Sequence, residues 1–135
     1  MRKLTAAVAI AALAIAVSAS SASAQTVTKF SVLAIGKGHR TSSGFVIKGR
    51  LVEPGERSEV VGSFKAEFSG PRGRHVRLVA FFPDGKLKAH GRIGPGDDKL
   101  PIIGGTRRWN GASGKVIAHS AGNNAELLTF TVVQG

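Results

Sequence analysis

The segment from Ile102 to Val116 constrains the fold of this chain more than any other part of the sequence. An apolar strand end leads into a pair of glycines, a tryptophan, two further glycines and the start of a second strand. Consecutive glycines allow a chain reversal that side chains would obstruct, and a tryptophan has a large apolar surface that can hold the crossing against a core. The order predicts a structural motif, made of Gly104, Gly105, Trp109, Gly111 and Gly114.

The rest of the chain is typical of an all-β protein. It contains 18 glycines, and beyond the N-terminal region short apolar runs recur between Gly, Pro, Asp and Asn. Such runs at near-regular spacing indicate a sandwich or a barrel. We predict strands at residues 26–35, 44–52, 59–68, 74–82, 86–93, 99–103, 115–119 and 127–133. Pro101 cannot donate a ladder hydrogen bond, so the sixth strand should be bulged there or shorter. Two glycine-rich polar stretches, 36–43 and 94–98, are predicted loops.

The strand after Pro83-Asp84-Gly85 shows the clearest alternation. Successive side chains of a strand point to opposite faces. One face of this strand is therefore apolar, and the other carries Lys86, Lys88, His90 and Arg92. We expect the four polar side chains to point outward together and to form part of an electropositive patch.

The first residues have the layout of a secretory signal peptide: Arg2 and Lys3, an alanine-rich apolar run, and the cleavage pattern Ala22-Ser23-Ala24. We therefore predict a signal peptide at residues 1–24 and one domain at residues 25–135, secreted to the periplasm or the extracellular space. The chain has no cysteine, so burial and hydrogen bonding must stabilise the domain without disulfides. A closed barrel suits that requirement, because closure leaves no unpaired strand edge.

The segment 102–116 resembles the Gly-Gly-Thr-Gly-x-aromatic-x-Gly-Ala-x-Gly signature of the allene oxide cyclase barrel-like and dirigent-like families, here in a bacterial secreted form. The matching residues are Gly104, Gly105, Thr106, Trp109, Gly111, Ala112 and Gly114. Arg107 stands where the family usually has a third glycine, so either Arg107 adopts a positive φ or the turn differs. The resemblance implies a single eight-stranded antiparallel β-barrel with an apolar interior, and assembly into a homo-oligomer.

No set of residues has the spacing of a catalytic or metal site. The four histidines, His39, His75, His90 and His119, are scattered without metal-ligand spacing, and most carboxylates fall in predicted turns or at strand ends. Glu67 lies inside a strand, where we expect an exposed ion pair. We predict no catalytic residue, no metal and no cofactor.

The positions assigned to the barrel interior mix small residues with Phe, Leu and Ile, and small inward residues either taper the packing or leave space for a ligand. We predict an apolar cavity at one barrel end, lined by Phe64, Phe68, Leu78, Phe82, Leu87 and Ala89. The favoured function is binding or orienting a small apolar molecule without catalysis. One alternative is an isomerase or cyclase acting on a lipid-derived or phenolic substrate. The other is a cationic cell-envelope binding protein whose barrel is fully packed.

The formal net charge of +11 favours contact with anionic partners, although it could serve solubility alone. An exported protein would meet an anionic envelope polymer rather than intracellular nucleic acid. Stacking platforms for single strands also need exposed aromatic side chains, whereas the Phe positions here are predicted to face the core. We therefore expect an anionic polymer, and no nucleic acid, as the macromolecular partner.

Overall fold

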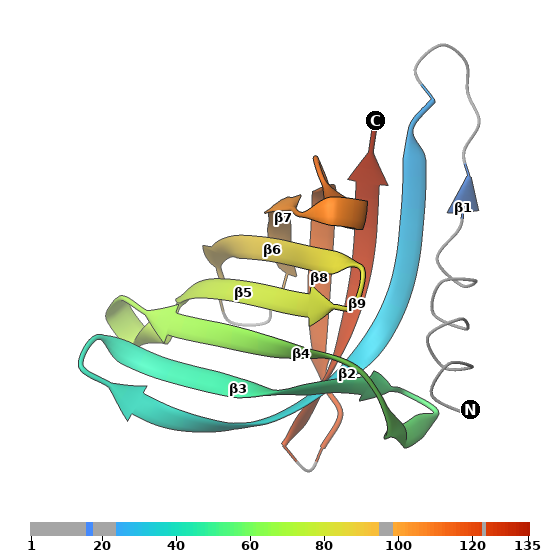
Figure 1. Cartoon of the computed structure of the whole chain (residues 1–135). Helices are drawn as coiled ribbons and strands as arrows, with labels where there is room; N and C mark the ends of the chain where they lie inside the picture. The colour runs from blue at the N-terminus through green and yellow to red at the C-terminus, as the bar shows by residue number, and fades with distance from the viewer. Residues whose placement is uncertain (1–15, 18–23, 95–98, 123) are drawn as a thin grey trace.

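The computed structural model describes residues 16–17, 24–94, 99–122 and 124–135, and these residues form mainly β-strands (Figure 1). The strands are β1 (Ala16–Val17), β2 (Thr26–Thr41), β3 (Gly44–Glu53), β4 (Glu56–Ser69), β5 (His75–Phe82), β6 (Gly85–Arg92), β7 (Lys99–Gly105), β8 (Ser113–Ser120) and β9 (Ala125–Gln134). Two short 3-10 turns, η1 (Pro71–Gly73) and η2 (Arg107–Trp109), lie between strands. No helix in the described part is long and apolar enough to cross a membrane.

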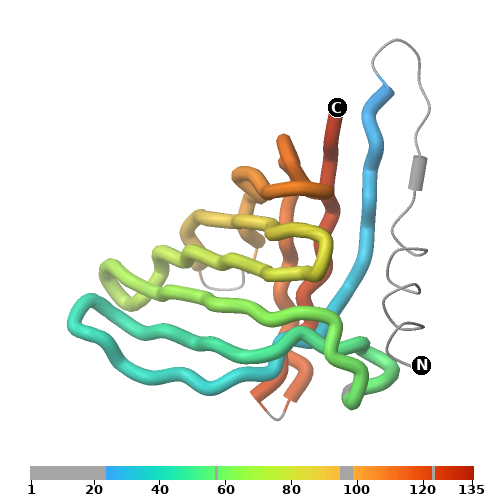
Figure 2. The backbone as a smooth tube through the Cα atoms, viewed as in Figure 1, coloured from blue at the N-terminus to red at the C-terminus, as the bar shows by residue number. Residues whose placement is uncertain are grey.

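Strands β2 to β9 form one closed antiparallel barrel of eight strands, as the sequence predicts. Each strand pairs with the next, and β2 closes the barrel by pairing with β9 from Thr26↔Gln134 to Ile35↔Ala125 (Figure 2). From Leu33 to Thr41, β2 pairs with β3 on its other edge. The long β2 therefore connects the first hairpin of the barrel with the last strand. The two-residue β1 pairs with the start of β2; most of the predicted signal peptide lies outside the described residues.

The first predicted loop, residues 36–43, is wrong for most of its length, because β2 continues to Thr41. Its glycines face β3 at close range: a Cβ on Gly36 would lie 2.5 Å from the carbonyl oxygen of Lys48. Glycine and polar residues are typical of a loop. In this strand the glycines allow close approach to β3, and the polar side chains are exposed to solvent. Of the second predicted loop, residues 95–98 lie outside the described residues.

A β-bulge in β4 changes the predicted alternation. Leu51 pairs with Gly62 whereas Val52 pairs with Val60, which leaves Val61 as the extra residue. Val60 is consequently 51% exposed and Val61 is buried, whereas strict alternation extended back from Phe64 and Gly62 would place Val60 inward and Val61 outward. One inserted residue moves every preceding side chain to the opposite face.

The predicted irregularity near Pro101 is also present. The register of β6 with β7 shifts between Lys88, which faces Gly104, and Ala89, which faces Ile102. Pro101 itself faces Lys115 of β8. The strand is therefore not shortened, since it extends to Gly105, and its bulge lies at Ile103, two residues beyond the predicted position.

Candidate functional site

The barrel contains a cavity of about 870 Å³ that is partly open to solvent. It lies toward the end of the barrel where the β2–β3, β4–β5 and β8–β9 connections are found, which we call the open end. Its large lining side chains are Phe45, Ile47, Phe64, Phe68, Val76, Leu78, Ile93, Leu100, Val116 and Leu128. The lining is therefore largely aromatic and aliphatic, as is usual for small-molecule sites.

Small residues on three strands create this space. Ala34, Gly36 and Gly38 occupy alternate inward positions of β2, while Ala66 of β4 and Ala118 of β8 also line the cavity. An eight-stranded barrel is just wide enough for large side chains to fill it. Where the inward side chains are reduced to a methyl group or a hydrogen atom, that width is left unfilled.

The polar groups of the cavity lie at its rim. They are Ser120, Asn124 and Glu126, and all three are exposed. These groups share the β8–β9 hairpin, so they flank one side of the opening. Lys37 also borders the cavity, but it pairs with Lys48 between the inward Gly36 and Gly38, which places its side chain on the outer face. Among the described lining residues, Lys37 and Glu126 are the titratable ones. The deep part of the cavity therefore offers van der Waals contact, and the rim offers hydrogen bonds and charge.

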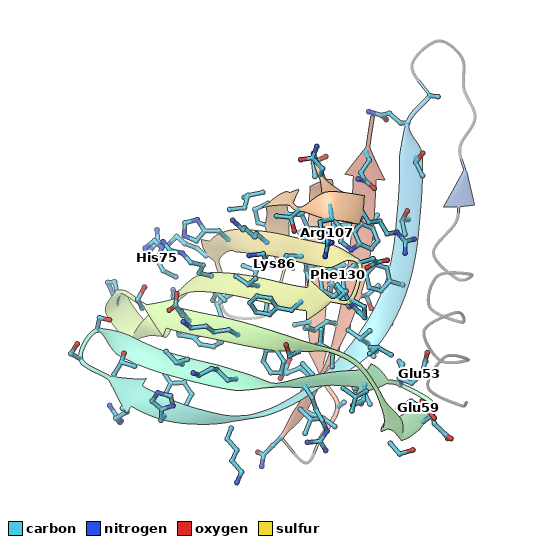
Figure 3. The ribbon with its side chains drawn as sticks, in the orientation of Figure 1. Glu53, Glu59, His75, Lys86, Arg107 and Phe130 are labelled. Atoms are coloured by element: carbon cyan, nitrogen blue, oxygen red, sulfur yellow. The ribbon has the colours of Figure 1, made fainter. Side chains whose placement is uncertain are left out.

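The opposite end of the barrel, which we call the closed end, is filled by a cluster of rings. Phe30 of β2 stacks on Phe130 of β9, with ring centroids 5.0 Å apart, and on Trp109, 5.7 Å away. Phe82 of β5 meets Phe30 edge-on at 5.6 Å. Figure 3 shows Phe130 among these interior side chains. Trp109 is 3% exposed and Phe130 is 1% exposed, so these rings fill the interior at this end.

The Gly-Gly crossing positions Trp109 in that cluster. A Cβ on Gly105 would lie 2.5 Å from the carbonyl oxygens of both Lys86 and Trp109, so a glycine is required for the close approach. The backbone N–H of Thr106 donates to the carbonyl of Lys86 at 3.0 Å, and the hydroxyl of Thr106 accepts from the backbone N–H of Lys86 at 3.1 Å. These contacts hold the crossing against the β5–β6 hairpin.

Outside the cluster, Arg108 covers the indole. Its guanidinium lies 4.6 Å from the Trp109 ring centroid and donates to the Asp84 carboxylate at 2.9 Å. Arg107 has φ of +56°, the left-handed conformation that a glycine at this position would adopt freely. Gly111 and Gly114 have positive φ values of 75° and 115°. The segment therefore turns as the signature implies, with an arginine in place of its third glycine.

The structure divides the residues that the sequence assigned to the cavity. Phe64, Phe68 and Leu78 line it, whereas Phe82 belongs to the ring cluster at the closed end. Leu87 and Ala89 are buried in the core but are not among the lining residues.

Other lining residues were missed by the sequence interpretation. Phe45 and Ile47 of β3 line the cavity but are not among the predicted lining residues. Gly36, Lys37 and Gly38 were placed in a loop. Extending the alternation of β2 beyond Ile35, which puts Gly36 and Gly38 in line with Ala34, is the signal that could have found them.

A pair of carboxyl groups lies at the closed end, in the β3–β4 hairpin, where Figure 3 shows Glu53 and Glu59 side by side. Glu59 is 7% exposed, and one carboxyl oxygen of each residue is buried without a hydrogen-bond partner. Burial, and secondarily the negative charge of Glu59, raises the pKa of Glu53. The pair is remote from the cavity. The described residues contain no group of three or more potential metal-ligating side chains.

Solved structures with this fold include two proteins of known name. A pyocyanin demethylase matches with a TM-score of 0.59 and 13% sequence identity, over 78% of this chain and 99% of its own. A pterocarpan synthase dirigent protein matches with a TM-score of 0.53 and 11% identity, over 84% of this chain and 87% of its own. No protein-family profile and no curated protein matches the sequence. The likeness establishes a dirigent-like barrel.

Proposed function

We propose that this barrel binds a small, largely apolar organic molecule in the cavity at its open end and holds it in one orientation. The observation that carries the proposal is the asymmetry of the cavity. Its walls are apolar, and its polar side chains, including Ser120 and Glu126, stand on one side of the rim. A ligand with an apolar body and one polar group would enter with that group directed toward the β8–β9 hairpin.

The lining favours binding and orientation over catalysis by the protein. General acid–base catalysis requires a titratable group held within hydrogen-bond reach of the reacting atoms. The deep wall is made of residues such as Phe64, Leu78 and Leu128, which can only exclude water and restrict movement. Any chemistry would then belong to the bound molecule, with the barrel restricting which of its faces or conformers can react.

The two structural neighbours support a small-molecule role. Their names specify pyocyanin as the molecule demethylated in one case and a pterocarpan as the molecule formed in the other. The packed-barrel alternative loses its structural basis, because the interior is hollow at one end. The isomerase or cyclase alternative still requires a cavity and is separated from simple binding by the test below.

The test is titration of the protein with an environment-sensitive apolar dye, followed by displacement with a panel of phenolic and lipid-derived compounds. We expect dye binding in the micromolar range, about 8 kcal/mol of binding free energy. Ala66→Phe places a ring inside the cavity and should abolish binding. Ser63→Phe is the matched control, because Ser63 lies on the same strand and is exposed on the outer face.

The outcomes separate the proposed functions. Equal dye binding by the wild type and Ala66→Phe, or no binding by the wild type, would contradict a ligand site in this cavity. Recovery of a displacing compound unchanged after incubation supports binding and orientation. Conversion of that compound to an isomer, lost in Ala66→Phe, would replace the proposal with the enzymatic alternative.

A further inference from the structure

The outer wall formed by β3, β4, β5 and β6 is strongly basic. Strand register places its outward side chains in rows that cross all four strands. The first row contains Arg50, Ser63, Phe81 and Lys86. The second row contains Lys48, Lys65, Val79 and Lys88, and the third row contains Val46, Glu67, Arg77 and His90. A fourth row contributes His75 and Arg92. Lys88, His90 and Arg92 are exposed and Lys86 is half-buried, and Figure 3 shows His75 and Lys86 on this wall. We call this surface the basic wall.

Positive charge on the basic wall is poorly compensated within the protein. Among these described outward positions, Glu67 is the one carboxylate, and it is shared between Lys65 at 3.3 Å and Arg77 at 3.9 Å. Lys48 lies directly opposite Lys65, an arrangement of like charges that destabilises a sheet. Such a surface gains free energy when negative charge from outside approaches it.

The basic wall also has a recess near the open end. This groove has a volume of about 350 Å³, and it shares Phe45, Phe68 and Val76 with the cavity lining. Its outward-facing lining consists of the buried Val46 and of polar groups from His75, Arg77, His90, Glu67, Thr41, Ser43 and Ser69. Guanidinium, imidazole and hydroxyl groups are donors suited to an anionic oxygen. Glu67 would oppose an anion, but its ion pairs with Lys65 and Arg77 offset that charge.

We propose that the basic wall binds a linear polyanion that carries one anionic oxygen group per repeat, with one such group seated in this groove. Neighbouring groups of the same polymer would lie over Lys88 and Lys65 and reach Lys86 and Arg50. Side chains two residues apart on a strand are about 6.8 Å apart, and neighbouring strands about 4.8 Å apart, so the cations form a closely spaced array. The cations of this site point outward from the barrel, so the proposal does not depend on which ligand the cavity binds.

The shape of the wall favours a polymer over a lipid bilayer. The wall is the outside of a closed barrel, and the groove is recessed between protruding side chains, so a flexible chain can lower one charged group into it. A flat anionic surface would meet mainly the protruding side chains. The aromatic ring exposed on this wall, Phe81, is 38% exposed and has the Lys86 ammonium 5.7 Å from its centroid. Phe45, which is 39% exposed and lines the groove, lies five residues along β3 from Arg50, the residue that shares the row of Phe81. The two rings are therefore separate and do not form a row of stacking platforms for nucleic-acid bases.

The experiment measures binding of the full chain to fluorescently labelled polyphosphate and, separately, to poly-glutamate at physiological ionic strength. The test variant is Arg77→Gln/Lys88→Gln. Its matched control is Lys29→Gln/Lys115→Gln, which removes the same charge from the opposite wall, where both lysines are exposed and flank Thr131. Thermal melting of both variants establishes that they remain folded. Anionic vesicles and single-stranded DNA of matched charge are the competing ligands.

We expect the test variant to bind about tenfold more weakly than the wild type, and the control to differ by less than about twofold. Affinity should fall with added salt, because exposed charges are screened beyond about 8 Å at physiological ionic strength. Binding of polyphosphate alone would identify phosphate as the group recognised, and binding of both polymers would identify anionic oxygen in general. Equal losses in the two variants, no binding of either polymer, or tighter binding to vesicles or DNA would each overturn the proposal.

Discussion

The two ends of this barrel are built from the same strands but have opposite interiors. Along β2, the inward side chains run from Phe30 and Val32 at the closed end to Ala34 and two glycines at the open end. Along β9, Phe130 and Val132 are almost completely buried, whereas Leu128 lines the cavity. Strand geometry is shared, so the difference comes from side-chain volume alone. One end can therefore stabilise the fold while the other stays hollow.

The largest expected effect is at Trp109. Trp109→Ala should destabilise the protein by about 3–5 kcal/mol, because truncating a buried ring leaves a cavity that the neighbouring rings cannot fill. Chemical denaturation measures the loss. A variant with wild-type stability would show that the closed end is not the main source of stability, and the contrast between the two ends would fail.

A methyl group added at Gly105 should also destabilise the closed end, in this case by displacing the backbone. Gly105→Ala brings a Cβ against the carbonyl oxygens of Lys86 and Trp109, so the crossing must shift, at an expected cost of about 1–3 kcal/mol. Gly55→Ala is the control, because a Cβ there has no atom within 4 Å. Thermal unfolding of the two variants tests the comparison, and equal melting temperatures would contradict it.

The same substitution at each end gives a direct comparison. Phe82→Ala removes a ring that contacts Phe30, Phe130 and Trp109, whereas Phe68→Ala removes a half-buried ring from the cavity wall. We expect Phe82→Ala to be more destabilising by about 1–2 kcal/mol, since Phe68 already borders empty space. In dye titration the order should reverse, with Phe68→Ala weakening binding more. Equal effects on both measurements would remove the functional distinction between the ends.

The smallest expected effect is a pH dependence of stability that comes from Glu53 at the closed end. The folded state raises the pKa of Glu53, so it holds this proton more tightly than the unfolded chain does. The contribution of Glu53 to stability should therefore be fully present below its ordinary pKa of 4.5 and should be lost as the pH rises from that value to the raised one. In Glu53→Gln this decline should be reduced, while the exposed Glu56→Gln keeps it. Melting temperatures across that pH range provide the measurement, and identical pH profiles for Glu53→Gln and the wild type would contradict the assignment.

The fold could be predicted from the sequence because its determinants are local. Strand-length apolar runs, turn residues and the segment around Trp109 each act within a few positions, and they indicated all eight barrel strands to within a few residues except at the end of β2. That end was missed because Gly36, Gly38 and their polar neighbours resemble a loop. They are paired only because β3 folds back on them.

The site was predicted less well, because whether an inward residue lines the cavity depends on its position along the barrel axis. Alternation identifies Phe64, Phe82 and Leu87 equally well as interior candidates. It does not reveal that the first borders open space while the other two lie toward the closed end. The bulge at Val61 is also invisible to a period-two pattern, since it appears only when β4 is registered against β3. The position of an inward residue along the barrel axis is a property of the assembled strands.

The seam between β2 and β9 has a consequence for how the chain folds. The hydroxyl groups of Ser31 and Thr129 lie 2.9 Å apart across this seam, although 98 positions separate them in the sequence. Contacts between such distant residues slow folding, because the loop must close before it is stabilised. Every other pairing in the barrel is a hairpin-like neighbour pair, so an emerging chain can form a curved open sheet early. Until β9 arrives, the edges of β2 and β8 remain unpaired and able to pair with other chains, and closure of the seam ends that vulnerability.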